Sequence, residues 1–273
     1  MKLKSRDIQM EAKDCGIKCY KIRDEDEGSK YPAVNPILPQ PPFLLLGVGS
    51  VRSSKTSTLI NMLRRDDMYG SKYWDDTVII SNTINNDRKG KYLRDAFRVE
   101  DHFENRFIDD IISKQKVLDR EDMPTQLIVL DDIISADFKK STNNSVNSVS
   151  TRFRHYELSL MIFVQSFKAV SNMIRSNATD ILIFRQQSTT ELDKIQEEYA
   201  DLAPRNFMNY YKIAHAEPYH FLYIDAQHNP AKFYNSFEEL IGIGDKMVYT
   251  GSIPQDEEEL FEKQKQEKKG MVK

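Results

Sequence analysis

The sequence has few cysteines, no long apolar run and no large excess of either charge. Its 273 residues include two cysteines, Cys15 and Cys19. A CxxxC pair without nearby histidines is weak support for zinc, so two free thiols in a reducing compartment are the better interpretation. No stretch of eighteen apolar residues occurs, which argues against a membrane span. Residues 1–16 lack the apolar region of a secretory signal, so we expect a protein that is not secreted.

The net charge is small, because 39 Lys and Arg against 42 Asp and Glu give −3. The chain as a whole is therefore not basic in the way many nucleic-acid-binding proteins are. Residues 135–190 differ, since seven basic against three acidic side chains give a local balance of +4. With 40% hydrophobic residues the chain can bury a core. We expect a globular protein with one locally basic region.

The chain divides into three parts. Residues 1–41 are charged and then rich in proline, with five prolines from Pro32 to Pro42, which predicts an irregular leader because proline excludes helix. Residues 42–250 carry regular hydrophobic patterns and are predicted to form one domain. Residues 251–273 are acidic and then basic, which predicts a helical or disordered tail.

Short apolar runs alternate with amphipathic stretches along the predicted domain. The runs expected as strands are 43–48, 76–81, 126–132, 158–165, 180–184 and 219–226. The stretches expected as helices follow Thr56 and cover 105–118 and 188–202, the last opened by Ser188 and Glu191 at the spacing of a capping box. This order predicts an α/β fold with a central, mainly parallel sheet and helices on both faces. We expect residues 219–226 to close the ordered part.

The stretch Gly47–Thr58, GVGSVRSSKTST, is close to the phosphate-binding pattern G-x-x-x-x-G-K-[ST]. Gly49, Lys55 and Thr56 fill the first glycine, the lysine and the hydroxyl positions, and Ser54 replaces the second glycine. A strand before the loop and a helix after it are the required context, because backbone N–H groups and the helix N-terminus face the phosphates. We predict that Lys55 bridges the β- and γ-phosphates and that the Thr56 hydroxyl holds Mg²⁺.

Serine at position 54 is the departure from the pattern. If φ there is positive, serine costs about 1 kcal/mol relative to glycine, which weakens or slows a site without abolishing it. The predicted nucleotide-binding residues are Gly49, Ser50, Val51, Arg52, Ser53, Ser54, Lys55, Thr56 and Ser57. A surface turn that happens to carry a lysine is the alternative.

The run LIVLDD delivers two carboxylates, Asp131 and Asp132, to a strand end. In a P-loop ATPase, one carboxylate orients Mg²⁺ and the next polarises the attacking water, and we assign Asp131 and Asp132 to these roles in that order. Two solvated carboxylates are the alternative. Gln165 ends the following strand and is a candidate to sense the γ-phosphate or orient water, although a strand-end amide can also cap the next turn.

Three arginines lie near the ends of the same elements, namely Arg152, Arg154 and Arg175. Any one of them could stabilise transition-state charge from a neighbouring subunit. Each has the alternative of being a surface residue or part of a salt bridge.

The order of the motifs, GVGSVRSSKTS, LIVLDD, TRFRHYELSLMIFVQSF and MIRSNATDILIF, resembles the genome-packaging ATPases of large double-stranded DNA viruses. The resemblance is to the poxvirus-type branch of the FtsK–HerA superfamily and covers Phe43 to Phe184, about half of the chain. The two P-loop motifs are shared by many families. The series RHYELSLMIFVQS and IRSNATDILIF narrows the choice, because that family places arginine-histidine, a strand ending in glutamine, and IRxN in this order.

The resemblance implies a RecA-like core, a homo-oligomeric ring, and ATP-driven translocation of duplex DNA into a preformed capsid, with a capsid or vertex protein as a further partner. It implies Mg-ATP as the cofactor and the host cytoplasm, in a viral factory, or the virion as the location. Lys55, Thr56, Asp131, Asp132 and Gln165 match its motif positions. The three arginines are carried over only as finger candidates.

A ring that grips DNA needs basic groups facing its channel rather than a basic chain. The polar, lysine-bearing stretch 138–154 is expected to be poor in helix and to contain a DNA-contacting loop, with Lys139 and Lys140 as the leading residues. A surface loop without that role is the alternative. Other functions left open are a DNA-dependent ATPase or helicase, a small-molecule kinase, and a non-catalytic nucleotide-binding scaffold of the virion.

Overall fold

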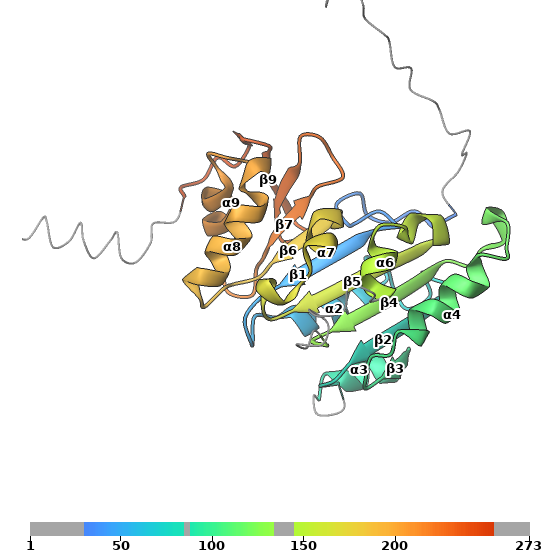
Figure 1. Ribbon diagram of the computed structural model, residues 1–273. Coiled ribbons are helices and arrows are strands. Elements are labelled where there is room, and N and C mark those ends of the chain that lie inside the picture. The colour runs from blue at the N-terminus through green and yellow to red at the C-terminus, as the bar shows by residue number, and fades with distance from the viewer. Residues whose placement is uncertain (1–29, 85–87, 134–144, 254–273) are drawn as a thin grey trace, which may run out of the picture. The chain divides into compact units, whose positions relative to one another are not determined.

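The computed structural model describes residues 30–84, 88–133 and 145–253 (Figure 1). The chain separates into two units, Met1–Lys30 and Tyr31–Lys273. Every helix and strand described below lies in the second unit.

A ten-stranded sheet forms the centre of this unit (Figure 1). Across the sheet the strands are β10 (Lys246–Met247), β9 (Glu239–Ile243), β8 (Lys232–Asn235), β7 (Leu222–Asp225), β6 (Asp180–Ile183), β1 (Leu44–Val48), β5 (Leu158–Val164), β4 (Gln126–Asp131), β2 (Asp76–Ser81) and β3 (Arg98–Glu100). From β6 to β3 all neighbours pair in parallel, and β7 to β10 continue the sheet antiparallel. The mainly parallel α/β fold is thus confirmed.

Helices cover both faces of the sheet (Figure 1). One face carries α2 (Lys55–Arg64) and α3 (Gly90–Arg94). The other carries α4 (Arg106–Gln115), α6 (Ser145–Ser150), α7 (Asn172–Asn177), α8 (Thr189–Tyr199) and α9 (Phe207–Ala214). Among the helices that the structure describes, none is long and apolar enough to cross a membrane.

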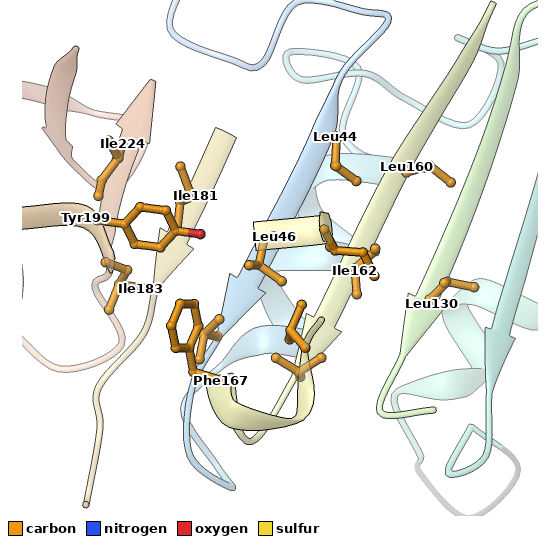
Figure 2. Packing of buried hydrophobic residues seen from close by; sticks show 14 of the residues in the cluster. Leu44, Leu46, Leu130, Leu160, Ile162, Phe167, Ile181, Ile183, Tyr199 and Ile224 are labelled. Atoms are coloured by element: carbon orange, nitrogen blue, oxygen red, sulfur yellow. The ribbon is translucent and has the colours of Figure 1, made fainter. Parts of the chain in front are cut away.

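Strand β1 shows why the sequence forms a sheet buried on both sides. Leu44, Leu46 and Val48 belong to the cluster under the α4–α9 face, and Figure 2 shows Leu44 and Leu46 beside residues of β5 and β6. Leu45 belongs to the opposite cluster, with residues of α2. Gly47 is required because a Cβ there would lie 2.4 Å from the Phe163 ring. The period of two along β1 therefore fills both cores.

The expectation that residues 219–226 close the ordered part is wrong, because β8, β9 and β10 follow β7. The sequence does carry a signal for the last hairpin. Gly244 and Asp245 alone separate β9 from β10, and Gly244 has φ 52°. A two-residue loop with glycine at a positive φ is a typical hairpin connection.

The described end of the predicted leader, residues 31–41, contains no helix or strand but packs onto the sheet unit. Tyr31 and Leu38 are buried, and the Tyr31 hydroxyl donates to the Glu157 carbonyl over 3.0 Å. The domain boundaries at residues 42 and 250 stay a prediction. Residues 254–273 of the predicted tail lie outside the described residues.

Candidate functional site

The sheet order brings the predicted site residues to one edge. Strand β5 lies between β1 and β4, and Phe163 of β5 is in register with Gly47 on one side and Asp131 on the other. Because these strands are parallel, the segments that follow them leave the sheet at the same edge. The phosphate loop, Gln165 and Asp132 therefore meet there.

Backbone hydrogen bonds hold the start of the phosphate loop on both sides. The Gly49 N–H donates to the Val164 carbonyl of β5 over 3.1 Å, and the Ser50 N–H donates to the Arg185 carbonyl over 3.3 Å. The Ser50 hydroxyl also accepts from the Gln187 N–H at 2.9 Å. The loop is thus fixed between β5 and the segment after β6.

The first glycine of the pattern is needed for space. A Cβ at Gly49 would lie 2.5 Å from the Ser53 hydroxyl oxygen and 2.4 Å from Phe184 Cβ. Because neither distance is tolerated, a larger residue would displace the loop from its strand. The loop therefore depends on Gly49 for its curvature.

Ser54 adopts the left-handed conformation, with φ 76° and ψ 7°. Its side chain makes no capping hydrogen bond to α2, although it stands at the N-cap position. Arg52 has φ 64°, so two non-glycine residues of one short loop occupy a region that favours glycine. The strain anticipated for serine at position 54 is present.

Lys55 begins α2 and is almost fully buried, with 6% of its surface exposed. Its Nζ donates to the Gly49 carbonyl over 2.6 Å and to the Ser50 carbonyl over 3.0 Å. Burial lowers the pKa of the Lys55 amine, and the negative charges of Asp132 and Asp131 oppose that shift. Phosphate oxygens are acceptors of the same kind as these carbonyls, so Lys55 can exchange one for the other.

The two carboxylates at the end of β4 lie in different surroundings. Asp131 is buried and accepts from the Ser81 hydroxyl of β2 over 3.1 Å. Asp132 has φ 53°, and its carboxylate accepts from Gln165 Nε2 over 2.9 Å. Its other oxygen is buried and has no hydrogen-bond partner among the described residues. The structure thus brings Asp132 and Gln165 together, with one carboxylate oxygen left to accept a further hydrogen bond.

The donors near the loop suit a magnesium ion. Thr56 supplies a hydroxyl in the first turn of α2, and Asp131 supplies a carboxylate. Both are hard oxygen ligands, and Mg²⁺ is usually held by one or two such groups together with substrate phosphates and water. Within residues 30–84, 88–133 and 145–253, no group of three or more His, Cys, Asp or Glu side chains could hold a metal ion. The residues therefore fit an ion shared with a phosphate ligand.

Two of the three arginine candidates lie away from this edge. Arg152 and Arg154 flank Phe153, the first residue of the turn before β5, and so lie at the opposite edge of the sheet. Arg152 donates to the carbonyl and hydroxyl of Ser148. Arg154 is exposed, with its guanidinium 5.5 Å from the centre of the Phe153 ring.

Arg175 of α7 is engaged within the chain. Its Nη1 lies 3.2 Å from Glu198 Oε2, and its guanidinium lies 4.9 Å from the centre of the Phe167 ring. These contacts hold α7 against α8 and the segment after β5. Any role on a neighbouring subunit would require Arg175 to give them up.

The predicted DNA-contact residues Lys139 and Lys140 lie outside the described residues. The described part of stretch 138–154 is not poor in helix as expected, because residues 145–150 form α6. Val146 and Val149 explain this difference, since both are fully buried in the core under α4 and α7. Tertiary burial outweighs the weak helix propensity of the serines and asparagines.

The capping box predicted for Ser188 and Glu191 is also wrong. Ser188 makes no side-chain cap. The Glu191 carboxylate instead accepts from the Ser166 hydroxyl over 3.1 Å and from the Phe167 N–H over 2.8 Å. Glu191 therefore fixes the segment immediately after Gln165, a role that spacing along one helix could not reveal.

We compared the chain with protein-family models, with curated proteins and with solved structures. No protein-family model matches the chain, and no curated protein matches its sequence. Among solved structures, the genome-packaging NTPase B204 from Sulfolobus turreted icosahedral virus 2 in complex with sulfate has TM-score 0.52 and 18% identity, over 73% of this chain and 99% of that chain. Its complex with AMPPCP has TM-score 0.51 and 17% identity, over 72% and 98%.

B204, the DNA-packaging ATPase from Sulfolobus turreted icosahedral virus, has TM-score 0.50 and 15% identity, over 72% of this chain and 98% of that chain. Identities this low show a common fold and no more. The chain therefore has the P-loop NTPase fold of these viral genome-packaging proteins, as the resemblance in its motifs predicts.

Proposed function

We propose that the chain is an ATP-driven motor that uses Mg-ATP to translocate viral double-stranded DNA into a preformed capsid. The observation that carries the proposal is the meeting of Lys55, Asp132 and Gln165 at one sheet edge, with Gln165 Nε2 2.9 Å from the Asp132 carboxylate. The fold shared with proteins described as a genome-packaging NTPase and a DNA-packaging ATPase supports the choice of substrate.

The phosphate end of the site follows from the loop and α2. Lys55 carries its amine among the loop carbonyls, where it stabilises the β- and γ-phosphates and the charge that develops between them. Thr56 and Asp131 would hold Mg²⁺. The bound ion would neutralise charge on the phosphate oxygens.

The hydrolytic end consists of Asp132 and Gln165. A water bound to the buried free oxygen of Asp132 would be oriented for attack, and that carboxylate would accept its proton. The Gln165 amide donates to the second carboxylate oxygen, which holds Asp132 in place and leaves its own carbonyl oxygen to orient the water. Aspartate and glutamine act here as a pair.

An arginine from a second copy would complete the site. Arg154 is the best candidate because it is exposed and, among the described residues, forms no ion pair or hydrogen bond. It lies at the amino edge of the sheet, about 20 Å from its own phosphate loop, the length of strand β5. If Arg154 acts on a phosphate site, it would have to be the site of a neighbouring subunit, as in a ring.

Duplex DNA would contact a loop within the polar stretch 138–154 of each subunit, and Lys139 and Lys140 stay the predicted contacts. Reversing both charges should lower DNA-stimulated hydrolysis and leave hydrolysis without DNA unchanged, because only the phosphate contacts of DNA are lost. Unchanged DNA stimulation would remove these two lysines from the proposal.

The proposal is tested by ATP hydrolysis with and without duplex DNA, in the wild type and in Lys55→Ala. Stimulation by DNA that disappears in the variant is the expected result. ATP hydrolysis at the same rate with and without DNA would contradict the proposed motor function. So would transfer of the phosphoryl group to a small acceptor.

A non-catalytic nucleotide-binding scaffold of the virion is the second candidate. It is favoured by the strained Ser54 and by Lys55 bonding to its own loop. No ATP hydrolysis in the same assay, together with tight ATP binding in a separate binding measurement, would establish it.

A further inference from the structure

A hollow of about 600 Å³ opens beside the phosphate loop, over the first turns of α2. Its volume is in the range of small-molecule sites. Its wall combines loop, helix and strand-end residues, namely Arg52, Ser54, Ser57, Thr58, Asn61, Lys89 and Tyr219. The hollow is thus continuous with the residues that would hold phosphates.

Topology explains why Tyr219 reaches this place. Strand β7 runs antiparallel to β6, with Leu222 opposite Ile183. The residues just before β7 therefore lie at the carboxyl edge of β6, which is also the edge of the phosphate loop. Tyr219 comes three residues before Leu222 and there lines the same hollow as Ser57, Thr58 and Asn61 of α2.

The conformation of Tyr219 is unusual for an aromatic residue. Its φ is 70°, a region that bulky side chains rarely adopt. The residue is 78% exposed, whereas Tyr210, Tyr211 and Tyr223 nearby are all buried in the cores. Neither packing nor backbone preference accounts for a ring held outward over the hollow. Strain of this kind is typical of ligand-binding positions.

The hollow continues along α2. A second hollow, of about 290 Å³, shares Thr58, Asn61 and Tyr219 with the first. Ser57 and Asn61 are one helical turn apart, about 6 Å along α2. A groove therefore runs from the phosphate loop along α2 and passes under Tyr219.

We propose that this groove binds the ribose and base of the nucleotide, and that the Tyr219 ring stacks on the base. The proposal rests on the proposed function, because the phosphates must lie on the loop for the base to reach Tyr219. Every base presents a π-face to an aromatic ring, so stacking supplies affinity. The Asn61 amide, which can both donate and accept, faces the same groove and would contact the edge of the base.

The test compares ATP with inorganic triphosphate, which shares the phosphates and lacks the nucleoside. Tyr219→Ala should raise the Kd of ATP about tenfold or more and leave the Kd of triphosphate unchanged. Tyr219→Phe should bind ATP like the wild type. Tyr92→Ala is the matched control, because Tyr92 of α3 is also exposed, at 60%, and does not line the hollow.

Equal weakening of ATP and triphosphate in Tyr219→Ala would overturn the proposal, since the loop rather than the base would have been disturbed. Unchanged ATP binding in that variant would overturn it too. If the wild type binds neither ligand, the proposed function itself fails, and the two failures are thereby distinguished.

Discussion

Replacing Ser54 by glycine tests whether the phosphate loop carries backbone strain. Ser54 has φ 76° and ψ 7°, and its side chain makes no capping hydrogen bond that the substitution would remove. Glycine adopts this conformation without a steric penalty. We expect Ser54→Gly to fold normally and to bind ATP at least as tightly as the wild type.

The magnitude follows from two opposing terms. A non-glycine residue in the left-handed region costs about 1–2 kcal/mol, and this cost disappears in Ser54→Gly. Glycine is freer in the unfolded chain, which offsets about 0.5–1 kcal/mol of the gain. The expected net effect is a stabilisation of up to about 1 kcal/mol, or about 2–4 °C in Tm for a chain of this size.

Denaturant unfolding of wild type and variant measures this difference. Ser113→Gly is the matched control, because Ser113 is exposed near the end of α4 and glycine there should destabilise by up to about 0.5 kcal/mol. The two substitutions should therefore differ in sign. If Ser54→Gly loses as much stability as Ser113→Gly, the strain assigned to Ser54 does not exist.

Three further outcomes follow from contacts of the site and the core. Gln165→Ala should bind ATP normally and lower the steady-state turnover about hundredfold, because Asp132 loses the donor at 2.9 Å; normal turnover would exclude the amide from the reaction. Glu191→Ala should destabilise the chain by about 1–3 kcal/mol in denaturant, because the Phe167 N–H loses its acceptor; an unchanged midpoint would contradict that. Burial lowers the pKa of His215 to about 4. Because the unfolded chain therefore binds this proton more readily than the folded chain, the free energy of unfolding should fall by about 3 kcal/mol as the pH drops from about 6.5 to 4. The His215→Leu variant should lose that part of the pH dependence. If the free energy of unfolding changes with pH equally in wild type and variant, His215 is not buried as a neutral imidazole.

Patterns along the chain predicted the parts of the fold that local physics determines. The apolar run at β1 and the run LIVLDD both form strands buried on two faces, because a continuous apolar run fits only such a place in an α/β sheet. The phosphate loop that joins β1 to α2 was predicted from the spacing of Gly49, Lys55 and Thr56. Residue types alone also indicated that Lys55, Asp132 and Gln165 would share one edge, since parallel strands end together.

The rest depends on contacts between segments far apart in the sequence. Glu191 has the spacing of a capping residue, yet it bonds to Phe167, 24 positions away. The helix α6 forms in a stretch of serines and asparagines because Val146 and Val149 are buried. Tyr219 looked like one residue of a strand, and only the pairing of β7 with β6 puts it beside the phosphate loop.

Single-turnover hydrolysis of bound ATP tests most directly whether Lys55, Asp132 and Gln165, which lie together at the carboxyl edge of the sheet, form a catalytic site. Asp132→Asn keeps the size and the contact to Gln165 but removes the charge that would accept a proton, so bound ATP should be hydrolysed about hundredfold or more slowly with its affinity unchanged. Asp76→Asn, an exposed position at the start of β2 and the far edge of the sheet, should hydrolyse ATP at the wild-type rate. Equal rates in wild type and Asp132→Asn would contradict the account.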